Sequence, residues 1–135
     1  MARKRTTKTT KTTKTSRDPA GAEGAARDDP SPWVLAQDED WHVRATVAAG
    51  TRTPRRVLVK LANDLNERVR AAVAANPRAP VALLAVLAHD RNWRVRYAVT
   101  GNPATPQDVL ATMTNDYNWR VRGGVVMHLR PPPGE

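Results

Sequence analysis

The 135-residue chain contains no cysteine and no phenylalanine, and its aromatic residues are four tryptophans and two tyrosines. Without cysteine it cannot form a disulfide framework, an iron–sulfur cluster or a thiolate zinc site. The three histidines, His42, His89 and His128, follow no HExxH or other metal-ligand spacing. The serine-elbow and phosphate-loop motifs of common enzymes are absent as well. We therefore expect a nonenzymatic protein with no cofactor and no metal site.

Long hydrophobic runs are also missing from the sequence. No window approaches the roughly 18 consecutive apolar residues that suggest a transmembrane helix. Met1 is followed by charged and hydroxylated residues rather than by the apolar segment of a secretory signal. The sequence thus predicts a protein with no membrane association and a cytoplasmic location.

Positive charge is concentrated at the beginning of the chain, whose overall net charge is +9. The first 17 residues carry seven basic side chains, no acidic ones and three TTK units, so we expect residues 1–31 to form a disordered basic tail and linker. A flexible cationic arm binds polyanions by releasing counterions, which makes nucleic acid a candidate partner. The alternative is a solubilising extension with no partner. The seven residues are Arg3, Lys4, Arg5, Lys8, Lys11, Lys14 and Arg17.

The remainder of the chain repeats itself every 26 residues. Four Val-Arg pairs keep this spacing, beginning at Val43, Val69, Val95 and Val121. A short helical pair cannot bury its apolar stripe alone, so such repeats are expected to stack. The spacing predicts an all-α fold: a short α-solenoid of about three and a half two-helix repeats over residues 32–130, followed by a Pro-rich end at 131–135.

Each repeat is predicted to contain two short helices separated by a proline turn. The first helix is expected to begin after a capping residue, which is Asp40, Asn66, Asn92 or Asn118. The second is expected to carry proline at its first position, and Thr105 with Asp108 approximates a capping box. Leu58, Leu84 and Leu110 occupy one column that should stack through successive repeats.

The last repeat departs from the others. Gly123-Gly124 weakens the helix, each glycine costing roughly 1 kcal/mol, and Pro131-Pro132-Pro133 forbids a full second helix. Val125, Val126, Met127 and Leu129 are then expected at an uncapped end. Solenoids usually finish with a polar cap, so we hypothesise docking of another protein or self-association at this end. The alternative is fraying of a degenerate repeat.

The repeat resembles the leucine-rich repeat variant family of bacterial proteins and, more distantly, HEAT repeats. The match is carried by Leu87-Ala88, Asp90, Val95-Arg96 and Asn102-Pro103 with Pro106. The resemblance implies a superhelix of alternating short and longer helices and no particular activity. It also implies that recurring aspartates pair with the Val-Arg arginines between repeats. The cysteine-bearing cluster segment of some family members is absent.

A second set of basic residues precedes each Val-Arg pair. Arg68, Arg94 and Arg120 should form a positive strip beside Trp93 and Trp119, which is suited to binding an acidic protein segment or stacked bases. Glu67 interrupts the strip, and tryptophans at a repeat joint can simply pack over the neighbouring turn. Two functions remain: a helical scaffold for protein–protein interaction, or a nonspecific nucleic-acid-associated protein that uses the tail and the arginine strip.

Overall fold

The structure is a computed structural model that describes residues 30–130. Every regular element in that range is a helix, and the range contains no strand, as the repeat spacing predicted. The basic tail and the Pro-rich end lie outside the described residues. The helices are α2 (Pro32–Leu35), α3 (Trp41–Ala49), α4 (Arg55–Leu61), α5 (Glu67–Ala75), α6 (Val81–Leu87), α7 (Trp93–Gly101), α8 (Gln107–Ala111) and α9 (Trp119–Leu129).

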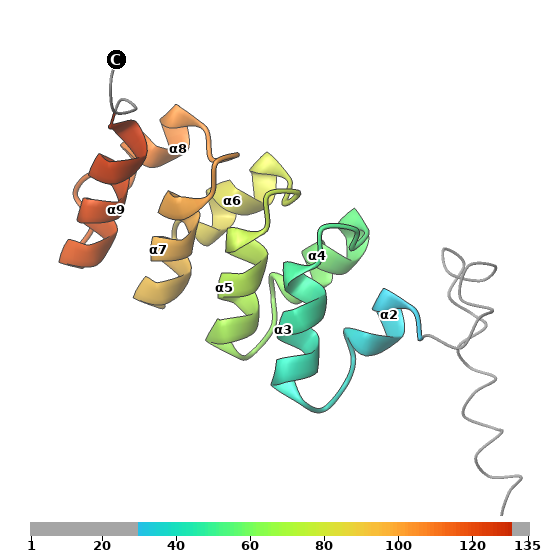
Figure 1. The fold of residues 1–135 in the computed structure, drawn as a ribbon. Coiled ribbons are helices and arrows are strands. Elements are labelled where there is room, and N and C mark those ends of the chain that lie inside the picture. The colour runs from blue at the N-terminus through green and yellow to red at the C-terminus, as the bar shows by residue number, and fades with distance from the viewer. Residues whose placement is uncertain (1–29, 131–135) are drawn as a thin grey trace, which may run out of the picture.

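The helices are arranged in two rows that alternate along the chain. Helices α3, α5, α7 and α9 lie side by side in one row, while the shorter α4, α6 and α8 follow one another in a second row (Figure 1). The most extensive contacts join α3 to α5, α5 to α7 and α7 to α9. This architecture confirms the all-helical solenoid. Helix α2 precedes α3 as a short helix of four residues at the start of the described array.

The predicted capping residues begin all four helices of the first row. Asp40, Asn66, Asn92 and Asn118 each accept a hydrogen bond from the backbone N–H two residues further on, at 2.8–2.9 Å. Each cap satisfies one of the backbone donors that a helix leaves unpaired at its start.

The second-row helices begin differently from the prediction. Pro54, Pro80 and Pro106 are N-cap residues with extended backbones, and the helices start one residue later. The Thr105–Asp108 capping box is also wrong, because the Thr105 hydroxyl donates to the carbonyl of Val99 at 2.7 Å. That carbonyl lies near the end of α7, where helical acceptors lack partners, so the hydroxyl completes the preceding helix instead of the following one.

The predicted columns of apolar residues form the core between the rows. Leu58, Leu84 and Leu110 are completely buried and form the second-row column. Val69, Val95 and Val121 of the first row are equally inaccessible, whereas Val43 in the first layer is only partly buried. Burying one such side chain contributes about 1.5–3 kcal/mol, so stability accumulates from layer to layer.

Helix α9 continues for 11 residues through its two glycines. Gly124 lies at a close approach of α9 to α7, since a Cβ atom there would lie 2.1 Å from Oγ1 of Thr100. Val125 is 2% exposed, so its predicted position on an open end is wrong: it occupies the repeat position of Val73 and Val99, which are completely buried, and belongs to the same apolar stripe. Val126, Met127 and Leu129 are exposed as expected.

Candidate functional site

The arginines of the Val-Arg pairs connect neighbouring layers. Arg70 donates from Nε to Oδ2 of Asp90 at 2.8 Å and from Nη2 to Oδ1 at 3.0 Å, and its Nη1 donates to the carbonyl of Asp64. The same bidentate pairing joins Arg44 to Asp64 and Arg96 to Asp116. These pairs confirm the pairing between repeats that the family resemblance implied. We call Arg44, Arg70, Arg96 and Arg122 the inner arginine column.

The environment of these pairs keeps both partners charged. Burial by itself raises the pKa of Asp64, but hydrogen bonds from Arg44 and from the Asn66 amide outweigh it and hold that pKa below its usual value. The pKa of Asp116 is lowered in the same way, against the effect of burial, by Arg96 and the Asn118 amide. Arg44, Arg70 and Arg96 of the inner column therefore act as fixed connections between layers, not as a free binding surface.

A second connection between layers was not predicted from the sequence. The buried side chain of Asn102 donates from Nδ2 to the carbonyls of Ala74 and Asn76, at 2.7 and 2.8 Å. Asn76 makes the equivalent bonds to Ala48 and Gly50. We call Asn76 and Asn102 the asparagine ladder. Their 26-residue spacing was a signal for it, but the Asn-Pro pairs were interpreted only as helix ends.

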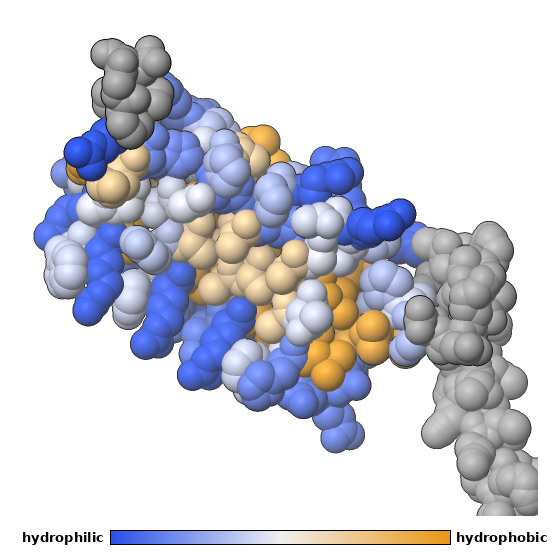
Figure 2. Space-filling view, in the orientation of Figure 1, coloured by the Kyte–Doolittle hydropathy of each residue, from blue (hydrophilic) through white to orange (hydrophobic). Residues whose placement is uncertain are grey.

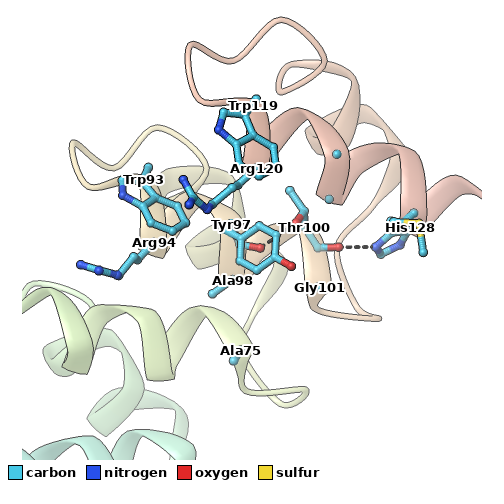
Figure 3. A pocket seen from close by; sticks show the side chains of 13 residues that line it. Ala75, Trp93, Arg94, Tyr97, Ala98, Thr100, Gly101, Trp119, Arg120 and His128 are labelled. Atoms are coloured by element: carbon cyan, nitrogen blue, oxygen red, sulfur yellow. Dashed lines mark hydrogen bonds between the residues drawn. The ribbon is translucent and has the colours of Figure 1, made fainter.

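His128 occupies the next position of this ladder, 26 residues after Asn102. Its Nδ1 lies 2.7 Å from the carbonyl of Thr100 and is the donor in that hydrogen bond (Figure 3). A carbonyl only accepts, so Nδ1 carries the proton in this arrangement. His128 is therefore a connection between α9 and α7, and the described structure assigns it no free catalytic position.

Arg68, Arg94 and Arg120, which we call the outer arginine column, lie against tryptophan rings. The guanidinium of Arg120 lies 4.9 Å from the ring centroid of Trp93 and 4.5 Å from that of Trp119. Arg94 lies 5.2 Å from the same Trp93 ring, so Arg94, Trp93, Arg120 and Trp119 form an alternating stack (Figure 3). Each such contact contributes about 0.5–1 kcal/mol at an exposed site.

The stack is interrupted at the second layer, as the sequence indicated. Arg68 lies 4.9 Å from the Trp41 ring, but the tryptophan position of its own repeat holds Glu67, whose carboxylate is 3.9 Å from Arg68. Trp41 and Trp93 are partly buried against the core, while Trp119 is 64% exposed. The open part of the face therefore lies at α7 and α9.

A broad groove lies beside this part of the face, between α7 and α9. Its volume is about 1070 Å³, and no acidic side chain lines it. The groove is lined by three glycines without side chains, Gly123 and Gly124 of α9 and Gly101 at the end of α7. Tyr97, Met127 and Ala98 add apolar side chains to the lining. Figure 2 shows an apolar band across the middle of the array with a hydrophilic edge beside it. We call this groove and the alternating stack the Trp–Arg face, made of Trp93, Arg94, Tyr97, Trp119, Arg120 and Met127.

The structure brings the predicted site residues together only in part. Trp93, Trp119, Arg94, Arg120 and Met127 all line the groove, but Arg68 lies outside it. Val126 and Leu129 are exposed on α9 and do not line it either. The seven basic residues of the tail lie outside the described residues.

Two further properties concern residues 30–130 as a whole. Within this range no three histidine or acidic side chains are grouped closely enough to hold a metal ion. None of the helices in the same range has the length and apolar character needed to cross a membrane.

Comparison with known proteins identifies the repeat. The family model described as leucine rich repeat variant matches residues 67–92, which span α5, α6 and the turn that leads to α7. The chain therefore carries a repeat of this family, as its sequence pattern indicated, and the distant likeness to HEAT repeats stays a prediction. No curated protein and no solved structure matches the chain.

Proposed function

We propose that this chain, a helical repeat scaffold with a leucine rich repeat variant repeat, is nonenzymatic and binds another protein through the Trp–Arg face. One observation carries the proposal: the two arginine columns have different partners. Arg44, Arg70 and Arg96 of the inner column are hydrogen-bonded to buried carboxylates and to backbone carbonyls. The guanidinium groups of Arg94 and Arg120 lie over ring faces, and among residues 30–130 they form no hydrogen bond or ion pair with an acceptor.

The groove favours a particular kind of peptide. A guanidinium stacked on a ring still presents the edge that binds carboxylates, and stacking fixes its orientation. The adjoining walls are apolar and the lining contains no carboxylate. An apolar side chain would occupy the groove while flanking Asp or Glu residues meet Arg94 and Arg120. Aromatic and arginine residues are also the types most enriched at the energetic centres of protein interfaces.

A titration followed by two-dimensional NMR tests this assignment. The probe is a synthetic peptide with one leucine flanked on each side by two glutamates. We expect it to shift the amide signals of Gly101, Gly123 and Gly124, which lie in the groove. Arg120→Glu should abolish these shifts, because it places a carboxylate opposite the peptide's own carboxylates.

Two controls make the titration specific. Arg55→Glu changes the charge by the same amount at an exposed position of α4, away from the groove, and should leave the shifts unchanged. A peptide with lysines in place of the glutamates should not bind. Equal shifts by both peptides, or equal loss in both variants, would contradict the assignment.

The alternative function is nonspecific association with nucleic acid through the basic tail and the outer arginine column. It is supported by the stacking of arginine on tryptophan, which single-stranded nucleic acids also use. Against it, Glu67 lies within the column and would repel a phosphate backbone. An oligothymidylate titration at two salt concentrations distinguishes the cases. Salt-dependent shifts at Arg94 and Arg120 would favour this alternative over the peptide.

The exposed end of α9 is a second contact surface in the proposal. Val126, Met127 and Leu129 are 66%, 61% and 48% exposed on one short helix. Apolar side chains gathered at the end of an array are suited to docking a partner or a second copy. Light scattering with Met127→Lys tests the contribution of this end.

A further inference from the structure

Each layer of the array covers one particular position of the layer before it. Ala48, Ala74 and Thr100, which are spaced by 26 residues, are at most 1% exposed. Val126 occupies the same position in α9 and is 66% exposed. Its exposure therefore reflects a stacking surface that the described part of the chain leaves uncovered.

The inner arginine column ends at the same place. Arg122 donates from Nη1 to the carbonyls of Asp116 and Tyr117, as Arg44 does to Asp38 and Glu39. Those bonds orient the guanidinium as in the other layers. However, Arg122 is exposed and forms no ion pair with any carboxylate among residues 30–130. It thus presents a preoriented donor pair at the surface of α9.

The opposite end of the array presents the complementary group. Asp64, Asp90 and Asp116 each receive an arginine from the preceding layer. Asp38 is the first member of this series, and within the described residues its carboxylate accepts only the amide of Asp40. Its neighbour Val43 is partly exposed, although Val69 at the same position of the next layer is fully buried.

We infer that a second copy of this chain docks head to tail on α9, with its α3 stacked on Val126 and its Asp38 bound by Arg122. This inference rests on the proposed contact surface of α9, and the added copy would also meet Trp119 of the Trp–Arg face. A second copy fits because both ends keep the chain's own register: Asp38 and Arg122 belong to the two series that pair within every inner junction. Its α2 would supply a second-row helix beside α9, where residues 30–130 contain none.

The contact has consequences for the assembly. Its two surfaces differ, so it is heterologous, and each bound copy leaves another free α9. The result is an open, concentration-dependent stack and not a closed dimer. His42 of the added copy would lie over Trp119, since Arg68 and Arg120 take that place over Trp41 and Trp93 in the inner layers.

Charge reversal tests the inference by sedimentation of the full chain up to about 1 mM, the range of weak association. The average mass of the unmodified chain should rise with concentration. Arg122→Asp alone and Asp38→Arg alone should each weaken association by about tenfold or more, because like charges then meet at every junction. Mixing the two variants should restore association, since each end then finds an opposite charge.

The apolar part of the contact has a matched control. Val126→Lys should keep the chain monomeric. Val86→Lys changes α6 at an equally exposed valine, 66% in both cases, and should associate like the unmodified chain. A mixture of charge-reversed variants that stays monomeric while both remain helical by circular dichroism would overturn the inference. So would an unmodified chain that is monomeric at every concentration. The peptide titration has its own readout, the amide signals of Gly101, Gly123 and Gly124, so failure of the stacking inference is distinguishable from failure of the proposed function.

Discussion

Arg94 and Arg96 lie two residues apart on α7 but have entirely different surroundings. Arg96 is 14% exposed and binds the carboxylate of Asp116 with two hydrogen bonds. Arg94 is exposed and lies on the Trp93 ring, and no carboxylate among the described residues pairs with it. The same pairing of a buried and an exposed arginine recurs on α5, where Arg70 is the buried member.

The difference shows how one helix serves stability and recognition together. An arginine that follows the buried valine faces the junction, where the next layer supplies an aspartate at every step. An arginine that precedes it faces solvent at the start of the helix, where only tryptophans recur. Register is thus held by the inner column, and the outer column can vary without disturbing the stack.

The largest expected effect is on stability at the inner column. Arg70→Ala leaves Asp90, whose side chain is 9% exposed, as an unpaired buried charge. Breaking a buried ion pair in this way costs about 3–5 kcal/mol. Arg68→Ala, at the exposed position of the same helix, should change the free energy of unfolding by about 0–1 kcal/mol. Urea unfolding followed by circular dichroism measures both.

A conservative change sharpens this comparison. Arg70→Lys keeps the charge but loses the bidentate geometry, so it should recover only part of the loss. If Arg68→Ala and Arg70→Ala lowered the urea midpoint equally, the inner column would not contribute more to stability than the outer column.

The asparagine ladder should show the next largest effect. Asn102→Ala leaves the buried carbonyl of Ala74 without its donor, whereas the carbonyl of Asn76 keeps the amide of Ala79. A buried acceptor left unpaired costs about 1–3 kcal/mol. Asn92→Ala removes a helix cap on the exposed edge of α7 and should cost only about 1 kcal/mol. A larger loss from Asn92→Ala would indicate that the ladder is not an important connection between layers.

The two glycines of α9 should respond in opposite directions. Gly124→Ala places a methyl group 2.1 Å from Oγ1 of Thr100, an overlap that overpacked cores accommodate at about 1–3 kcal/mol. Gly123 has open space around its Cβ position, so Gly123→Ala should stabilise the helix by up to about 1 kcal/mol. Thermal unfolding of the two variants measures this difference, and destabilisation by Gly123→Ala would contradict the open groove.

Much of the architecture could be predicted from the sequence because the same residue pattern recurs in each repeat. The columns of Leu58 and Val69, the asparagine caps and the aspartate–arginine pairs all recur at a fixed spacing. Tertiary packing is nearly local in a solenoid, so a one-dimensional pattern carries most of the three-dimensional information. The exposure of Val126 was predictable as well, because the repeat pattern stops after it.

The remaining features depend on distances that the pattern does not contain. Asn102 was assigned to a helix end because proline follows it, and that local rule says nothing about a carbonyl 28 residues earlier in the chain. Thr105 was assigned to a capping box with Asp108, and only the structure shows that its hydroxyl turns back to α7. Gly124 was interpreted as a weak point, although the approach of α9 to Thr100 requires the absence of a side chain there.

The smallest expected effect concerns pH and involves the inner column alone. Hydrogen bonds from arginine and from a backbone amide outweigh burial and lower the pKa of Asp64 and Asp116 in the folded protein. The unfolded chain therefore takes up protons first, at its usual pKa of about 3.9. The stability that these carboxylates contribute is fully present above that pH and is lost as the pH falls through their folded pKa values.

The urea midpoint of Asp116→Asn should lie below that of the unmodified chain at pH 7 and approach it toward pH 2. Arg120→Ala, which removes no carboxylate pair, should instead keep a constant offset over the same range. A converging offset for Arg120→Ala would show that the two columns are coupled.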